Sequence, residues 1–79
     1  MVTPTFEATR INHVRELCNK QKPPMDKKTF VREVGYQTNI SRTTLEKAYN
    51  GATVLDYDVI EKIAWFFEVG TEDVLESKF

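Results

Sequence analysis

Residues 26–51, DKKTFVREVGYQTNISRTTLEKAYNG, decide the fold of this chain. They predict two short helices, one over 26–35 and one over 41–49. Each helix begins at a good N-cap, Asp26 or Ser41, whose side-chain oxygen can accept a hydrogen bond from a backbone N–H of the first turn. The two helices are therefore expected to follow each other closely, with a polar connection between them.

Glycine marks the expected end of both helices. Gly35 offers a C-terminal stop for the first, and the pair Asn50-Gly51 is a strong ending signal for the second. With these ends, the residues Tyr36-Gln37-Thr38-Asn39 fall outside both helices. We therefore expect a long connection between them.

Apolar residues at helical spacing continue on both sides of this pair. Ahead of it, they predict a helix over about 7–19 that stops before Pro23-Pro24. Behind it, a helix capped by Asp56 is expected to run to Phe67, and a short fifth helix follows Thr71. The apolar stripes of these three helices are Ile11, Val14, Leu17 and Cys18; Val59, Ile60, Ile63, Ala64 and Phe67; and Val74 and Leu75.

Three of the predicted helix starts share a second signal, an apolar residue just before the cap and another four positions after it. Such a pair can pack together as a hydrophobic staple. The pairs are Met25/Phe30, Ile40/Leu45 and Leu55/Ile60. Strand-like alternation bounded by hairpin turns is missing. The predicted fold class is therefore all-α, a compact five-helix domain over residues 1–79 with a helical core of about 7–77.

The composition is typical of one small globular domain. The chain has 79 residues, of which 41% are hydrophobic and 29% are charged. The longest apolar run, 63–67, is too short to cross a membrane, and the first residues lack the features of a signal peptide. We therefore expect a cytoplasmic protein with no membrane partner. With one cysteine, Cys18, and one histidine, His13, neither an internal disulfide nor a zinc site is expected.

The charges are divided unevenly along the chain. Residues 1–51 hold nine of the eleven Lys and Arg residues against five acidic residues, a net charge of +4. Residues 52–79 hold two basic and seven acidic residues, a net charge of −5. One part of the surface could therefore face phosphate while another faces away, although the division could equally serve only solubility.

Several segments of the chain together resemble one family. They are Val14-Arg15-Glu16-Leu17, Met25-Asp26-Lys27-Lys28-Thr29-Phe30-Val31, Ile40-Ser41-Arg42-Thr43-Thr44-Leu45-Glu46-Lys47, Asn50-Gly51, Val59-Ile60-Glu61-Lys62-Ile63-Ala64 and Glu72-Asp73-Val74-Leu75. In residues and spacing these segments are similar to the Cro/XRE, lambda-repressor-like helix-turn-helix family. Two features differ from it: the connection 19–24 looks longer than usual, and Tyr36-Gln37-Thr38-Asn39 looks like a four-residue insertion in the central turn.

The resemblance implies that the helix over 41–49 lies in the major groove of duplex DNA. The residues implied to meet base edges are Ser41, Arg42, Thr43, Thr44 and Lys47. Arginine can bond to two acceptors of guanine, and threonine offers a hydroxyl and a methyl group suited to thymine. Without the resemblance, Thr43 and Thr44 are as well explained as solvated residues on an exposed face.

Two lysines are expected to hold phosphate. Lys27 and Lys28 fall in the first turn of the helix over 26–35, where free N–H groups and the helix dipole favour an anion. Lysine is electrostatically unfavourable there unless a phosphate binds, and the alternative is that both residues only keep the protein soluble. Asn50 and Thr53, just after the next helix, are expected to add phosphate contacts.

The helix that ends at Phe67 carries two large side chains that its apolar stripe does not need. Trp65 falls at the edge of that stripe, and Phe66 is similarly oversized. With Tyr57 or Phe79 they could form an apolar patch for a second copy of the chain or for another protein. The alternative is that Trp65 packs over a helix end in the small core.

These features predict a sequence-specific, duplex-DNA-binding transcriptional regulator. We expect a homodimer, because one such domain makes few contacts and doubling them restores affinity and site length. The alternative left open is a protein-interaction module on the same fold, with weak or lost DNA binding. No nucleophile–base set, glycine-rich phosphate loop or pair of pocket carboxylates indicates an enzyme. Neither a cofactor nor a small-molecule substrate is expected.

Overall fold

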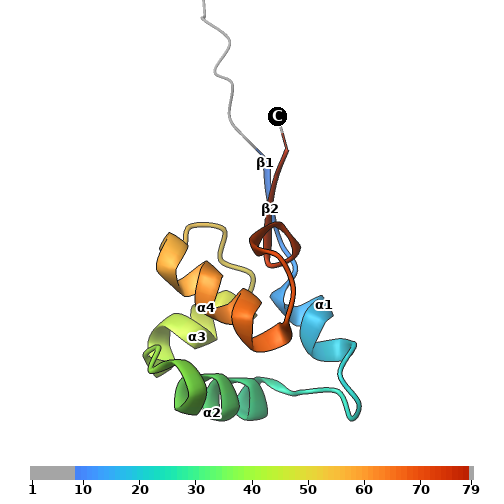
Figure 1. Cartoon of the computed structure of the whole chain (residues 1–79), viewed down its shortest axis with the longest axis vertical. Helices are drawn as coiled ribbons and strands as arrows, with labels where there is room; N and C mark the ends of the chain where they lie inside the picture. Colours follow the sequence, from blue (N-terminus) through green and yellow to red (C-terminus); the bar gives the residue numbers. More distant parts are fainter. Residues whose placement is uncertain (1–8, 79) are drawn as a thin grey trace, which may run out of the picture.

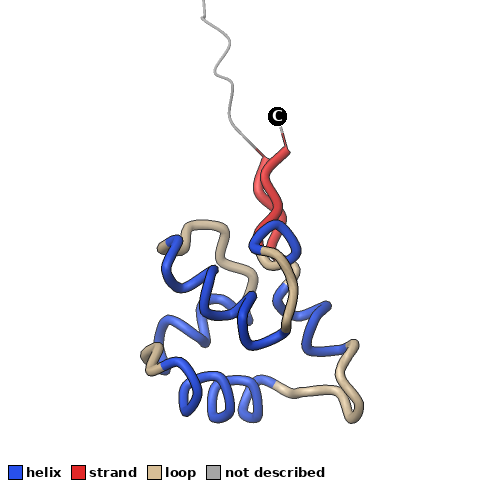
Figure 2. Tube along the Cα trace, viewed as in Figure 1, coloured by secondary structure: helices blue, strands red, loops and turns tan. Residues whose placement is uncertain are grey.

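The computed structural model describes residues 9–78, which form a helical body from which two short strands extend (Figure 1). In chain order the elements are β1 (Thr9–Asn12), α1 (Val14–Asn19), α2 (Lys27–Thr38), α3 (Arg42–Tyr49), α4 (Tyr57–Phe67), the 3₁₀ helix η1 (Thr71–Asp73) and β2 (Leu75–Lys78). Figure 2 shows the two strands side by side at one end of the helical body. None of the described helices is long and apolar enough to cross a membrane.

Three helices begin where their caps predict. The N-caps of α2, α3 and α4 are Asp26, Ser41 and Asp56. The backbone N–H of Thr29 donates to Asp26 Oδ1 at 2.8 Å, and this bond lowers the pKa of the Asp26 carboxyl. The predicted starts are therefore confirmed.

The end of α2 differs from the prediction and shortens the central turn. Gly35 does not stop the helix, which continues through Tyr36 and Gln37 to Thr38. The C-cap is Asn39, at φ 60°, and its backbone N–H donates to Gly35 O at 3.0 Å. Asparagine tolerates this left-handed conformation better than most residues, so Asn39 ends the helix in place of a glycine. The expected four-residue insertion in the turn is therefore not confirmed, and residues 39–41 alone join α2 to α3.

Gly35 lies inside α2, where that helix faces α3. A Cβ atom at Gly35 would lie 3.5 Å from Leu45 Cδ1 and 3.7 Å from Ile40 O. Both are ordinary contact distances, so the packing leaves room for a methyl group at this position, and Gly35 makes no turn.

The chain is mostly helical, but five helices are not confirmed. Residues 9–12 of the predicted first helix form β1, which pairs antiparallel with β2 so that Arg10 faces Ser77 and Asn12 faces Leu75. The predicted fifth helix is the three-residue η1, and Leu75 lies in β2. Residues 7 and 8 of the predicted helical core lie outside the described part. Hydrogen bonds between β1 and β2 therefore take the place of the helical hydrogen bonds that were expected in each of these two segments.

The core lies between the helices and is closed by the residue after η1. Its buried apolar members are Val14, Leu17, Cys18, Phe30, Val34, Leu45, Ala48, Ile60, Ile63, Ala64 and Val74. Phe30 of α2 is central, with its ring stacked on Phe67 at 6.2 Å between centroids and tilted against Tyr49 at 5.9 Å. These contacts join α2, α3 and α4 and fix the direction in which α3 presents its outer face.

Candidate nucleic-acid interface

The outer face of α3 is polar and open to solvent. Leu45 and Ala48 are buried on the inner face. The opposite side carries Arg42, Thr43, Lys47 and, at the C-cap, Asn50, all of them exposed. Thr43, Lys47 and Asn50 follow one another at offsets of four and three residues, so they share one stripe of the helix surface. With Arg42, these are four of the eight predicted DNA-binding residues, and the other four are Ser41, Thr44, Lys27 and Lys28.

The side chains of Ser41 and Thr44 form hydrogen bonds with each other at the start of α3. Ser41 Oγ accepts a hydrogen bond from the backbone N–H of Thr44 at 3.3 Å and donates to Thr44 Oγ1 at 2.8 Å. Ser41 is exposed and Thr44 is half-buried. Their first role is therefore to cap the helix, which orients the exposed residues beside them.

A groove between α2 and α3 gathers positive charge. It has a volume of about 790 Å³ and is lined by Lys27, Lys28, Val31, Arg32, Arg42 and Glu46. Four of these six side chains are cationic and one is anionic. The structure thus brings the predicted residues Lys27, Lys28 and Arg42 together around one open groove, which attracts an anionic ligand.

Arg32 is the cationic residue of this groove that the sequence analysis did not predict to bind DNA. It lies one helical turn after Lys28 on α2, and its side chain is 65% exposed. Its Nε donates to Glu33 Oε1 at 3.3 Å, a contact between exposed groups of the kind that contributes little to stability. The four-residue spacing from Lys28 was the available signal.

Arg42 forms an exposed ion pair with Glu46 that a ligand can replace. Its Nε donates to Glu46 Oε1 at 2.8 Å, one turn later on α3, while the Arg42 side chain stays 83% exposed. An exposed pair of this kind is worth about 0.3–0.5 kcal/mol on a helix, so a phosphate or a base edge can displace the carboxylate at small cost.

Comparison with protein families agrees with this arrangement. A family model described as a Cro/C1-type helix-turn-helix DNA-binding domain matches residues 12–79. The chain belongs to this family. No curated protein and no solved structure matches the chain. A DNA-binding regulatory role follows from membership, and α2 and α3, with their three-residue connection, form the helix-turn-helix of this Cro/C1-type domain.

A second surface of the Cro/C1-type domain surrounds Trp65 on α4. The Trp65 and Tyr57 side chains are each 65% exposed. Phe66 is half-buried and packs edge-on against Phe67 at 5.1 Å between centroids, so it belongs to the core margin more than to an open patch. Phe79 lies outside the described residues.

Shallow hollows flank Trp65 on both sides. Gln37 of α2 lines both of them, so this residue lies with Trp65 and is absent from the residues that line the cationic groove. Three acidic side chains line the same region, Asp58, Glu61 and Glu68, against one basic side chain, Lys62, which pairs with Asp58 at 3.1 Å. This face therefore has the opposite charge from the cationic groove and is poorly suited to DNA.

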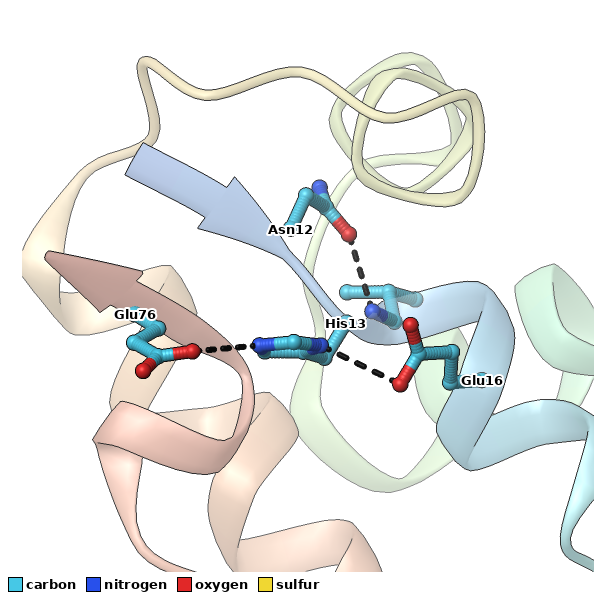
Figure 3. Close-up of polar contacts among 5 residues, drawn as sticks. Asn12, His13, Glu16 and Glu76 are labelled. Carbon is cyan, nitrogen blue, oxygen red and sulfur yellow. Dashed lines mark hydrogen bonds and ion pairs between the residues drawn. The ribbon is translucent and has the colours of Figure 1, made fainter. Parts of the chain in front are cut away.

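His13 joins the terminal strands to the helical body. Its Nε2 lies 3.0 Å from Glu76 Oε1 on β2, and its Nδ1 lies 3.2 Å from Glu16 Oε2 on α1 (Figure 3). The hydrogen bond with Glu76 raises the pKa of His13, Glu16 adds to this, and burial opposes it. Because both ring nitrogens face carboxylates, the protonated ring, which donates from both, fits this site best.

Cys18 takes no part in either surface. It is fully buried in the core, and this burial raises the pKa of its thiol to about 11. The thiol therefore stays protonated and packs as a small apolar group. Among residues 9–78, no group of three or more His, Cys, Asp and Glu side chains is arranged to hold a metal ion.

Proposed function

We propose that this Cro/C1-type domain is a sequence-specific transcriptional regulator that reads the major groove of duplex DNA with α3. The observation that carries the proposal is the exposed polar stripe of α3 beside the cationic groove. Together they offer hydrogen-bonding side chains for base edges and positive charge for the phosphates that flank them. The acidic α4 face then points away from the duplex.

The base-reading residues of the proposal are Arg42, Thr43 and Lys47. Thr43 and Lys47 make no side-chain hydrogen bond or ion pair within residues 9–78, so they are free to bind. Arg42 can release Glu46 and form two hydrogen bonds with guanine. Ser41 and Thr44 lie at the same end of the helix, where their capping bonds hold Arg42 and Thr43 in direction.

Phosphate binding is assigned to the groove and to the end of α3. Lys27, Lys28 and Arg32 present three positive charges along one side of α2, and Asn50 adds an exposed amide. Each phosphate that a cation neutralises releases counterions, so the affinity must fall as salt rises. Binding to mixed-sequence DNA is expected to rest mainly on these residues.

A homodimer is part of the proposal, with Trp65 at the contact between copies. One domain of this size offers few base contacts, and a second copy doubles the site. An indole that is 65% exposed is a suitable anchor, because tryptophan is among the residues that carry most binding energy at interfaces. The same surface would serve a different protein if the chain proves monomeric on DNA.

The test is fluorescence anisotropy with mixed-sequence duplex DNA at several salt concentrations. The wild type is compared with a Lys27→Ala, Arg42→Ala, Lys47→Ala variant and with a charge-matched Lys20→Ala, Lys22→Ala, Lys62→Ala control outside the proposed interface. Circular dichroism confirms that each folds. We expect the first variant to lose salt-sensitive binding and the control to keep most of it. Equal losses in both, or no binding by the wild type at low salt, would refute the proposed interface.

A further inference from the structure

Asn12 connects three parts of the fold through one half-buried side chain. Its Oδ1 accepts a hydrogen bond from the backbone N–H of Val14 at 2.8 Å, which caps the start of α1 (Figure 3). Its Nδ2 donates to Ala48 O at 2.9 Å and to Ala52 O at 2.7 Å. Both of these carbonyls belong to the C-terminal end of α3 and the turn that follows it.

The same face of β1 makes a second contact with this turn. Arg10 precedes Asn12 by two residues, so the two side chains lie on one side of the strand. Arg10 Nη1 donates to Thr53 O at 3.4 Å. Three carbonyls of the segment 48–53 therefore receive hydrogen bonds from β1.

The helix α3 is short and buries few of its own residues, so hydrogen bonds from β1 can affect its position. The helix has eight residues and buries Leu45 and Ala48. A helix this short has little stability of its own, so its direction depends on the core contacts of its inner face, including Tyr49 against Phe30, and on what holds its two ends. Ser41 caps the first end, and Asn12 holds the other.

Asn12 is itself fixed by the C-terminal part of the chain. It pairs with Leu75 in the β1–β2 ladder, and the backbone N–H of His13 donates to Val74 O at 2.9 Å. The position of β2 is therefore transmitted through Asn12 to α3.

We propose that Asn12 is a positioning residue for DNA recognition, which sets the angle of α3 by bonding its last carbonyls to the terminal strands. The inference rests on the proposed function of α3. Phosphate contacts tolerate small changes of angle, because they depend on charge, whereas base contacts need aligned hydrogen bonds. Loss of the Asn12 donors should therefore reduce sequence preference more than total affinity.

The test begins with selection of a preferred duplex from a random library by the wild-type chain. Affinity for this duplex and for a scrambled one is then measured for the wild type, for Asn12→Asp and for Asn19→Asp. Aspartate at residue 12 keeps the acceptor for Val14 N–H but removes both donors to α3. Asn19 is exposed at the end of α1, so Asn19→Asp is the control with the same change of charge.

We expect Asn12→Asp to lower the ratio of the two affinities by about tenfold relative to Asn19→Asp, which is the discrimination of one aligned base contact. The salt dependence of binding to the scrambled duplex should match that of the control. An unchanged ratio would overturn the inference and leave the proposed function intact. A wild type that prefers no sequence would overturn both, and a wild type that binds no duplex would overturn DNA binding itself.

Should Asn12→Asp fail to fold by circular dichroism, Arg10→Ala decides the question. Its side chain is exposed, and its bond to Thr53 O holds the same turn. Lys22→Ala, which removes one charge from an exposed loop residue, is the control. A ratio about twofold to threefold below that of the control supports the positioning role, given that one long, solvent-exposed hydrogen bond is worth under 1 kcal/mol. An equal ratio overturns it.

Discussion

Replacing Gly35 by alanine tests whether this residue is part of α2 or ends it. Within a helix, glycine is about 0.8–1.0 kcal/mol less favourable than alanine. The new methyl group would meet Leu45 Cδ1 at 3.5 Å and Ile40 O at 3.7 Å, which are ordinary contact distances, so no clash offsets the gain. We expect Gly35→Ala to stabilise the domain by about 0.5–1 kcal/mol and to raise Tm by roughly 2–8 °C.

Thermal and urea unfolding followed by circular dichroism measure this change, and Gly51→Ala is the matched control. Gly51 lies at φ +100°, and a Cβ there would meet nothing within 4 Å, so the backbone alone decides its effect. A left-handed conformation costs a residue with a side chain about 1–2 kcal/mol, so Gly51→Ala should destabilise. Destabilisation of Gly35→Ala by a similar amount would show that Gly35 ends the helix, and the three-residue turn would be wrong.

Three further predictions concern the core, the terminal strands and the α4 surface. Phe30→Ala should cost about 3–5 kcal/mol in urea unfolding because it removes the ring shared by α2, α3 and α4, whereas Phe30→Leu should cost less. The contribution of His13, whose pKa is raised above 6.5, should be fully present below pH 6.5 and lost as the pH rises through the folded-state pKa. Unfolding of the wild type and His13→Gln across this range checks the sign, and a difference that does not shrink with rising pH would contradict it. Trp65→Ala should weaken self-association in sedimentation while leaving the salt dependence of DNA binding per bound chain unchanged, and an unaltered dimer would exclude Trp65 from the contact.

Local signals in the sequence were sufficient for the helix starts and for part of the site. Asp26, Ser41 and Asp56 act through hydrogen bonds or backbone geometry within one turn, so a short window contains the information. Lys27, Lys28 and Arg42 were each predicted to bind DNA, but the predicted turn between their helices was too long to show that they line one groove.

The end of α2 and the two strands were predicted wrongly, because they depend on residues outside a short window of sequence. Gly35 can end a helix or lie within it, and here the helix continues to Thr38 because Asn39 provides the left-handed C-cap. Asn39 can take a left-handed conformation, but asparagine does so far less regularly than glycine, so its role as a C-cap was missed. The β1–β2 ladder joins residues at opposite ends of the chain, and neither strand shows strong alternation by itself.

The most direct test of the DNA-facing surface is an NMR titration of the ¹⁵N-labelled chain with its selected duplex. On a duplex cut down to the length that one domain covers, we predict large shifts for the amides of Arg42, Thr43 and Lys47 and for α2 near Lys28, with the indole N–H of Trp65 unchanged. Shifts centred on Trp65 and α4, with the amides of α3 unchanged, would contradict recognition through α3.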